Sequence, residues 1–474
     1  MTASTNESSN ALKPHVPKRA FARSAPQRTT AWCLALLLAS ALGLRAEAPF
    51  AKWWTGKDAS GHWMGVRQSL EDRGVILTGN WKGTFYGIIN GGIQERGTFD
   101  EELHFHLKLD FEKMLGLTGL SAYGSVRWRD GENPNLYTGN SAAFNPSNTQ
   151  VGKQWRLMPL YLAWESRDLL PVKDMLTLSG GWTNPYFAFI QQPESRLFVN
   201  NAIHQTKGLV NSGFPWSGAY NTWGGHIKVK PVEWHYVQAG LYMAIPGALS
   251  TANHGLYFEG AHPADSNGLY AIGETGITPK IGASKLPGKY AFGGMYFGLE
   301  NKSFFGETYD GRYALYWQAD QMLFREPAPA PEAAPDGKSI AGKTHPEPMR
   351  VASKLSEQGL YGFSFLSFAP KYNNAMPLYF HAGLVYKGLI PTRDADQIGV
   401  VFGYGNYSYY KIVAENARGV SVHQTYEAVL EFDYRLQVTK FAYVQPFLQY
   451  LIRPNGTGLV ENATVLGLQM GVIF

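Results

Sequence analysis

Alternation of apolar and polar residues is the feature that most limits how this chain can fold. It is clearest at 103–112, where the odd positions are Leu103, Phe105, Leu107, Leu109 and Phe111 and the even positions are His104, His106, Lys108, Asp110 and Glu112. Successive side chains of a β-strand point to opposite faces, so one face is apolar and the other is charged. This contrast predicts a strand that stands between two different solvents.

The last stretch of the chain, Ala463–Phe474, has the same period. Its apolar face comprises Phe474, Val472, Met470, Leu468 and Leu466. Such a strand at the end of an exported chain is typical of outer-membrane barrels, in which the last strand pairs with the first. An edge strand of a soluble sheet is the alternative. In a barrel, we expect the smaller face, with Gly467, Gln469 and Gly471, to line water.

Composition favours one large barrel over several soluble domains. The 474 residues are 14% aromatic and only 17% charged, with 52 glycines, and the mean hydropathy is −0.22. A ring-rich chain that is polar on average suits strands with one face to lipid, one face to water, and aromatic girdles at the interfaces.

Fifteen alternating segments can be counted from position 75 onward. Bacterial single-chain barrels usually have an even number of strands. We therefore predict an all-β fold, a transmembrane antiparallel β-barrel of about sixteen strands with a short N-terminal helix. The uncounted strand is expected near 198–205 or 255–260. Long irregular connections are expected at 130–154, 184–221 and 245–288, and a mobile loop at 325–357.

The N-terminal region is predicted to be an export signal. Basic residues between Lys13 and Arg28 precede an apolar run at 31–44, and small residues follow around Ala46. We therefore expect a signal peptide at 1–46, a periplasmic leader with a short amphipathic helix at 47–74, and the outer-membrane β-barrel at 75–474. Ser60 and Gly74 are the expected ends of the helix.

Charge and metal-ligand patterns limit the partners. Residues 1–46 hold six Lys/Arg and one acidic residue, so 36 basic and 36 acidic residues remain. A net charge of zero gives no electrostatic footprint for nucleic acid. His104 and His106 share a strand face at a spacing that can chelate a metal. Because no third ligand is well placed, we expect two lumen histidines and neither a metal nor another cofactor.

Four segments resemble the carbohydrate-selective porins of the OprB family. They are GHWMGVRQSLEDRGV at 61–75, NTWGGHIKVKP at 221–231, PLYFHAGLVYKGLIPTRDADQIGVVFGYGNYS at 377–408, and YEAVLEFDYRLQVTKFAYVQPFLQYLIRPNG at 426–456. Met64-Gly65 replaces the usual Gly-Gly of the first motif. The resemblance extends from about Trp54 to Phe474. It implies a sixteen-stranded outer-membrane barrel for the diffusion of glucose and similar sugars.

Sugar diffusion needs charged groups that bind hydroxyls and aromatic faces for the apolar sides of pyranose rings. Alternation on the strand at 119–129 places Tyr123, Arg127 and Arg129 inside, and Asp130 follows at the loop. We predict that these four residues line the pore or its constriction. The alternative for the arginines is pairing with carboxylates of the wall. Arg67 is predicted to face the pore or anchor a plug, with a solvent-facing helix arginine as the alternative.

The connection at 184–221 is expected to fold inward as the constriction. Trp182 and Asn184 precede or begin it and are predicted to line the pore, although Trp182 equally suits a girdle ring. Trp216 lies within the connection. It is predicted to contact sugar, and packing of the connection against the wall is the alternative.

Enzyme patterns such as Gly-x-Ser-x-Gly and His-Glu-x-x-His are absent, so no catalytic residue is predicted. We expect a porin in the outer membrane of a Gram-negative bacterium that passes monosaccharides or small oligosaccharides, as a monomer or a homotrimer. Its other expected partners are outer-membrane lipid and the barrel assembly machinery, which would recognise the C-terminal strand. A lipid-hydrolysing barrel and a polysaccharide-export barrel are the alternatives.

Overall fold

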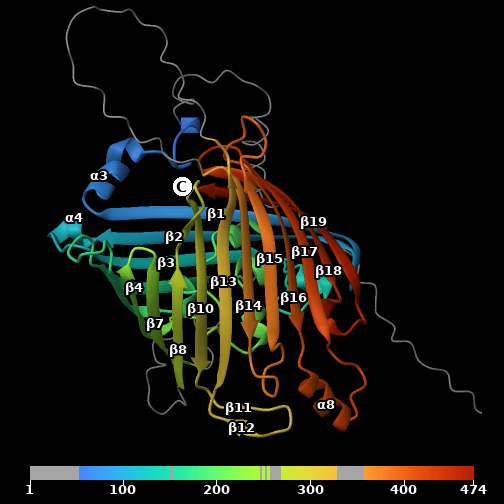
Figure 1. Cartoon of the computed structure of the whole chain (residues 1–474). Helices are drawn as coiled ribbons and strands as arrows, with labels where there is room; N and C mark the ends of the chain where they lie inside the picture. Colours follow the sequence, from blue (N-terminus) through green and yellow to red (C-terminus); the bar gives the residue numbers. More distant parts are fainter. Residues whose placement is uncertain (1–52, 150–152, 246–247, 251–253, 257–267, 328–356) are drawn as a thin grey trace, which may run out of the picture. The chain divides into compact units, whose positions relative to one another are not determined.

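The computed structural model describes residues 53–149, 153–245, 248–250, 254–256, 268–327 and 357–474. Within these residues, sixteen long strands form one closed antiparallel sheet in which neighbours along the chain are neighbours in the wall (Figure 1). The predicted all-β barrel of sixteen strands is confirmed. The predicted signal peptide at 1–46 lies outside the described residues.

The barrel strands follow one another around the wall. They are β1 (Val75–Gly92), β2 (Arg96–Asp110), β3 (Leu120–Gly131), β4 (Gln154–Glu165), β5 (Leu176–Thr183), β6 (Thr222–Val232), β7 (His235–Ala244), β8 (Gly268–Ile277), β10 (Leu286–Phe297), β13 (Arg312–Arg325), β14 (Gly359–Phe368), β15 (Leu378–Lys387), β16 (Gln397–Asn406), β17 (Tyr426–Gln437), β18 (Ala442–Ile452) and β19 (Glu461–Ile473). The short β9 (Lys280–Ile281) extends the turn before β10, and β11 (Asn301–Lys302) pairs with β12 (Thr308–Tyr309).

The barrel closes where β1, blue in Figure 1, pairs with β19, red. In this seam Phe85 lies opposite Leu468. Gly79 and Phe474 exchange backbone hydrogen bonds of 2.7 and 2.9 Å. Pairing the first strand with the last satisfies backbone groups that hydrocarbon could not solvate.

The strand that the sequence count missed is β8, Gly268–Ile277. The expectation of a strand at 198–205 is wrong, because this stretch contains the short helix α6 (Asn201–His204). Residues 255 and 256 are not in a strand, and 257–260 lie outside the described residues. β8 escaped the count because its inner face also holds apolar residues, Tyr270 and Ile272, which are buried inside the barrel.

Connections at the two ends of the barrel differ in length. At the end where β1 begins most are short, for example 166–175, 233–234 and 438–441, whereas the other end has 132–153, 184–221 and 245–267. Short turns are typical of the periplasmic side. The connection 326–358 is the exception on the short-turn side. Most of the mobile loop predicted at 325–357 lies outside the described residues.

Short helices lie in the leader and the connections. In the leader, the 3-10 turn η1 (Trp63–Gly65) precedes α3 (Val66–Asp72). Gly65, the last residue of η1 and the N-cap of α3, has a φ of 92°, which suits glycine. The others are α4 (Phe111–Leu115), α5 (Asn135–Thr138), η2 (Pro185–Phe187), η3 (Glu194–Leu197), α6, α7 (Gly208–Asn211), α8 (Tyr409–Ala417) and η5 (Pro454–Gly456). No helix among the described residues is long and apolar enough to cross a membrane.

Aromatic rings, rather than water, cover the small face of β19. A Cβ added to Gly467 would lie 2.0 Å from the Phe447 ring, and one added to Gly471 would lie 2.1 Å from the Tyr443 ring. Gln469 is 2% exposed. The expectation that this face lines water is therefore wrong, because its glycines make room for rings of the neighbouring strand β18.

Candidate functional site

Exposure along the strands identifies the inner wall of the barrel. On β17, Leu430 and Phe432 are each 46% exposed, whereas Glu431 between them is fully buried. Exposed apolar side chains of a transmembrane barrel meet lipid, so Glu431 faces the lumen. The same alternation places Lys82 and Glu102, which are register partners on β1 and β2, on the inner wall.

Residues 184–221, which we call the inserted segment, fold into the lumen as predicted. Gln192 donates from Nε2 to the carbonyl oxygen of Ser364 at 2.8 Å, and its Oε1 lies 3.0 Å from Nε2 of His381. The Tyr379 hydroxyl donates to the carbonyl oxygen of Ala202 at 2.7 Å. The inserted segment thus lies against the inner faces of β14 and β15 and narrows the pore.

A buried carboxyl group on β17 holds the middle of the inserted segment. Glu431 Oε1 accepts hydrogen bonds from the backbone N–H of Val199 at 2.7 Å and of Asn200 at 3.1 Å. Gln449 on β18 donates to the same oxygen and accepts from Asn200 Nδ2, both at 3.1 Å. Buried donors left without partners are costly, so this network fixes the position of the segment.

A second buried carboxyl group, Glu274 on β8, holds the beginning of the segment. It accepts from the hydroxyls of Tyr236 and Tyr316 at 2.7 and 2.8 Å and from two glutamine amides at 2.8 and 2.7 Å. Its Oε2 also lies 3.5 Å from the backbone nitrogen of Ile190. Residues of the wall and of the inserted segment donate these hydrogen bonds, so the role of Glu274 is structural.

Across β1–β4 the inner wall has a different character, because it is cationic. Lys82, Glu102 and Arg129 are neighbours in the strand register. Arg129 Nη2 lies 2.6 Å from Glu102 Oε2, and Arg127 Nη1 lies 3.6 Å from it. The three side chains of these ion pairs are 11–15% exposed. The Glu102 carboxylate therefore forms ion pairs with both arginines, and Lys82 is its neighbour on β1.

Lys207 of the inserted segment is influenced by the charges of this wall. Its side chain is buried, and burial together with the charges of Arg129 and Arg127 lowers its pKa from 10.5 to about 7. Because the charges of Arg129 and Arg127 act on this amine, we group it with them. We call Lys82, Glu102, Arg127, Arg129 and Lys207 the constriction cluster.

Arg156, on the inner face of β4, holds the end of the inserted segment and part of the connection after β7 in place. Its Nη2 donates to the carbonyl oxygens of Ala219 at 2.9 Å and Ala248 at 2.6 Å, and its Nη1 donates to that of Ser250 at 3.0 Å. It lies opposite Arg127 in the register. A guanidinium group has five N–H donors in one plane, so it can donate hydrogen bonds to several backbone carbonyl oxygens at once.

Two of the predicted pore residues, Arg127 and Arg129, thus meet in the constriction cluster, and Tyr123 lies farther along the same face of β3. Asp130 points to the opposite face, next to Glu101 in the register. Its carboxylate lies 3.4 Å from Lys153 Nζ and accepts the N–H of Gly131 at 2.7 Å. It is therefore placed at the rim of the strand, near the start of the connection.

The structure does not bring Arg67 to this cluster. The Arg67 side chain is 5% exposed and lies 3.2 Å from Asp58 and 3.3 Å from Glu71. Its Nη2 donates to the carbonyl oxygen of Leu77 at 3.2 Å. Arg67 therefore ties the leader to the beginning of β1.

Trp182, Asn184 and Trp216 are all buried. The Trp182 indole donates to the carbonyl oxygen of Gly255 at 3.2 Å. Asn184 donates to Asn221 Oδ1 at 2.8 Å, which joins the two ends of the inserted segment. The Trp216 ring packs edge-on against Tyr186 at 5.9 Å. All three have packing partners in or beside the long connections.

The His104 and His106 rings lie 3.9 Å apart on the inner wall. His106 Nδ1 is 2.5 Å from the Tyr123 hydroxyl, and His106 Nε2 is 3.2 Å from Asn80 Oδ1. Among the described residues, no group of three or more His, Cys, Asp or Glu could hold a metal ion.

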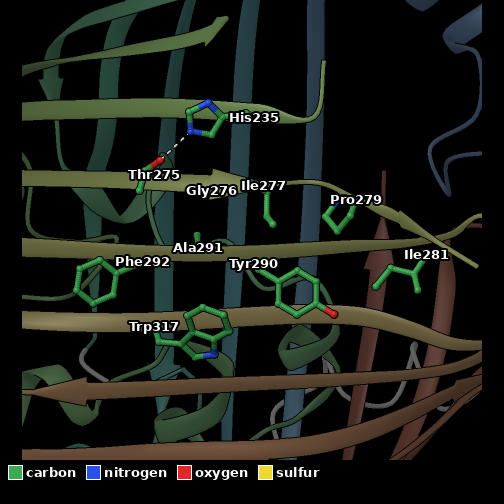
Figure 2. A pocket seen from close by; sticks show the side chains of 10 residues that line it. All are labelled: His235, Thr275, Gly276, Ile277, Pro279, Ile281, Tyr290, Ala291, Phe292 and Trp317. Atoms are coloured by element: carbon green, nitrogen blue, oxygen red, sulfur yellow. Dashed lines mark hydrogen bonds between the residues drawn. The ribbon is translucent and has the colours of Figure 1, made fainter. Parts of the chain in front are cut away.

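A shallow groove lies on the other side of the wall, across β7, β8, β10 and β13. Figure 2 shows its lining, which includes the side chains of His235, Thr275, Tyr290, Phe292 and Trp317. Phe292 and Trp317 are 50% and 39% exposed and belong to the lipid-facing positions of their strands. The groove is therefore separate from the lumen.

One pattern in the sequence invites a different interpretation. Residues 337–344 read Gly-Lys-Ser-Ile-Ala-Gly-Lys-Thr, which matches the letters of a phosphate-binding loop. That chemistry requires a strand, the loop and a helix in succession. This stretch lies outside the described residues, in the connection between two barrel strands, β13 and β14.

Comparisons with known proteins agree with this geometry. The family described as "Carbohydrate-selective porin, OprB family" matches residues 95–474. Porin B of Pseudomonas aeruginosa is 25% identical, over 95% of this chain and 99% of its own length. The putative porin QuiX of Acinetobacter baylyi is 21% identical, over 92% of this chain and 98% of its own.

Two solved structures of Pseudomonas putida OprB share the fold. The high-pH structure has a TM-score of 0.75 at 22% identity, and the low-pH structure has a TM-score of 0.53 at 19% identity. Each comparison covers 88% of this chain and 99% of the other.

Proposed function

Because the chain belongs to the OprB family of carbohydrate-selective porins, we propose that sugars cross its barrel between the inserted segment and the inner wall of β2 and β3, through the constriction cluster. The protein is an outer-membrane sugar channel and not an enzyme. The proposal concerns the route of sugars through the barrel and the residues along that route.

The observation that supports this route is the charge on both of its sides. Arg127, Arg129 and Glu102 lie on the wall, and the charges of both arginines act on Lys207 of the inserted segment. A sugar hydroxyl both donates and accepts hydrogen bonds, so arginines and a carboxylate in one cross-section can replace its water shell. An apolar constriction would leave the hydroxyls without partners.

We assign different roles to the predicted site residues. Arg127 and Arg129 donate to sugar oxygens, and Tyr123 offers an aromatic face farther along the wall. Asp130 points to the opposite face at the rim of β3, so we assign it no contact with sugar in the constriction. The partners of Arg67, Trp182, Asn184 and Trp216 support positioning roles, because these four side chains are buried among the leader and the long connections.

Liposome swelling with glucose, a disaccharide and an amino acid of similar size tests the route. We expect glucose to permeate faster than the amino acid. The Arg127→Ala, Arg129→Ala double variant should change glucose permeation severalfold, because both hydroxyl donors are lost.

The matched control is Lys153→Ala, because Lys153 is largely exposed and pairs with Asp130 on the opposite face of β3. Heat-modified migration on gels reports folding of each variant. Unchanged glucose permeation in a folded double variant would remove both arginines from the route.

We further infer the partners that the sequence predicted. The apolar outward positions of β19 support contact with outer-membrane lipid and recognition by the barrel assembly machinery. A homotrimer is the alternative to a monomer, and light scattering of the detergent-solubilised protein separates the two. Fractionation of the Gram-negative host tests the outer-membrane location directly.

A further inference from the structure

Two tyrosines on the inner wall of β3 and β4 stay partly open to the lumen. Other inner-wall tyrosines, such as Tyr270, Tyr316 and Tyr379, are 0–1% exposed. Tyr123 and Tyr161 are only half-buried. They face each other directly in the register of β3 and β4, and their ring centroids are 5.4 Å apart at an interplanar angle of 42°. The inserted segment therefore leaves this pair of rings uncovered.

The pair lies below the constriction cluster, toward the short-turn end. On β3 the inner positions run from Arg127 through Ser125 to Tyr123. At about 3.3 Å per residue, Tyr123 is about 13 Å from Arg127 along the strand. A sugar that leaves the arginines would thus meet the tyrosine rings next.

Polar groups surround the edge of these rings. The His106 ring lies 6.0 Å from the Tyr123 ring, and His106 Nδ1 is 2.5 Å from the Tyr123 hydroxyl. Asn80 Oδ1 is 3.2 Å from His106 Nε2, so both ring nitrogens have partners. These bonds hold the His106 ring and the Tyr123 hydroxyl in fixed positions.

We propose that Tyr161, Tyr123 and His106 form a second sugar subsite, on the short-turn side of the constriction cluster, which binds pyranose sugars. One face of a pyranose ring presents C–H groups, which leave water favourably when they meet an aromatic ring. Its hydroxyls lie at the ring edge, where the Tyr123 hydroxyl, which His106 holds in position, can bind them. The proposal rests on the proposed function, since the sugar must first pass the constriction cluster.

Comparing glucose with an open-chain polyol distinguishes binding at this subsite from binding that depends on hydroxyl groups alone. Sorbitol offers more hydroxyls than glucopyranose does, but it has no rigid C–H face. The arginines of the constriction cluster would bind glucose and sorbitol alike. Only glucose would gain from the tyrosine rings.

The test measures interruptions of the ionic current through single channels of the full-length protein when glucose or sorbitol is added. Tyr161→Ala should shorten the glucose interruptions by about three- to tenfold, the range expected for losing one aromatic contact. Sorbitol interruptions should stay unchanged. Tyr161→Phe should restore the glucose value, because it keeps the ring.

The control is Tyr313→Ala, since Tyr313 is 52% exposed among the outward positions of β13. Where Tyr161→Ala does not fold, Tyr161→Leu keeps an apolar side chain in the wall and removes the ring. Glucose interruptions that do not change in Tyr161→Ala and Tyr161→Leu, or that change equally for sorbitol, would overturn the subsite.

The failure of the proposed function has a different signature. In that case the wild-type protein would not swell liposomes in glucose, and the arginine variants would have no effect. If the wild-type protein passes glucose but the tyrosine variants match it in every readout, only the second subsite is wrong.

Discussion

The two halves of the inner wall use polar residues for opposite purposes. On β17 and β18, Glu431 and Gln449 are fully buried and bind the backbone and side chain of Asn200. On β2 and β3, Glu102, Arg127 and Arg129 keep 11–15% of their side-chain surface exposed. One half holds the inserted segment in place, and the other meets it across the pore.

Residues that anchor the inserted segment can therefore be distinguished from residues that line the pore. An anchoring residue has hydrogen bonds to the segment and no exposure, so its loss should move the segment. A lining residue belongs to a cluster in which one carboxylate is shared by several cations, so its loss should change selectivity while the pore keeps its width. Side chains of both kinds point into the barrel. The alternation of the sequence predicts this inward direction but does not distinguish an anchoring residue from a lining residue.

The largest effect is expected on the anchoring side. Glu431→Ala removes the acceptor for Val199 N and Asn200 N, and each buried donor left unpaired costs about 1–3 kcal/mol. The inserted segment should then leave the wall, and single-channel conductance should rise severalfold with loss of sugar discrimination. Glu431→Gln keeps one acceptor oxygen and should show a smaller rise. Equal conductance in Glu431→Ala and wild type would refute the anchoring role.

An intermediate effect is expected on the lining side, from Lys207. Its pKa is lowered to about 7, so the amine gains a proton as pH falls from 8 to 6. Channel selectivity for chloride over potassium should increase over this interval, measured as a reversal potential. Lys207→Met should abolish the change. A pH dependence that survives in Lys207→Met would assign it to another group.

The same shift affects stability with a definite sign. Because the folded pKa of about 7 lies below the ordinary value of 10.5, the folded protein binds fewer protons than the unfolded chain between these pH values. Stability should therefore rise with pH from about 7 toward 10. Lys207→Met should flatten this rise in thermal unfolding.

The smallest effect is expected at the turn before β16, which belongs to neither half of the pore. Asp396 accepts from Arg393 at 2.8 and 2.9 Å and from Gln437 N at 2.9 Å. Burial raises the pKa of this carboxyl, but the bonds from Arg393, Tyr434 and Gln437 outweigh it and lower the pKa. Its stabilisation is therefore present above pH 4 and lost in more acidic solution.

Asp396→Asn should lower the stability of the barrel by about 1–2 kcal/mol at neutral pH, with sugar permeation unchanged. Thermal unfolding and liposome swelling of the same preparation check both parts. A change in permeation would link this turn to the pore after all.

The sequence predicts the strands of this protein better than its site. Alternation such as that at 103–112 needs only neighbouring residues, and it identified the inward faces of Arg127 and Arg129. It failed at β8, because the inserted segment buries Tyr270 and Ile272 and makes the inner face apolar. A different cause applies at Gly467 and Gly471, because rings of the neighbouring strand β18 cover them.

The missed members of the site depend on contacts between distant parts of the chain. Lys82 and Glu102 lie on predicted strands, but only the register places them beside Arg129. Lys207 lies in an irregular connection, where no periodicity gives its direction. Trp182 and Trp216 look like pore rings in the sequence, and only the fold reveals that both are buried.

The most direct test of the account uses a thiol at the proposed narrowest point. Lys207→Cys, compared with Tyr313→Cys on the outer face, is treated with a bulky thiol reagent in both variants while the conductance and glucose permeation are measured. The predicted result is that the reagent blocks current and glucose in Lys207→Cys and leaves Tyr313→Cys unaffected. Full glucose permeation through completely labelled Lys207→Cys would contradict the route between the inserted segment and the inner wall of β2 and β3.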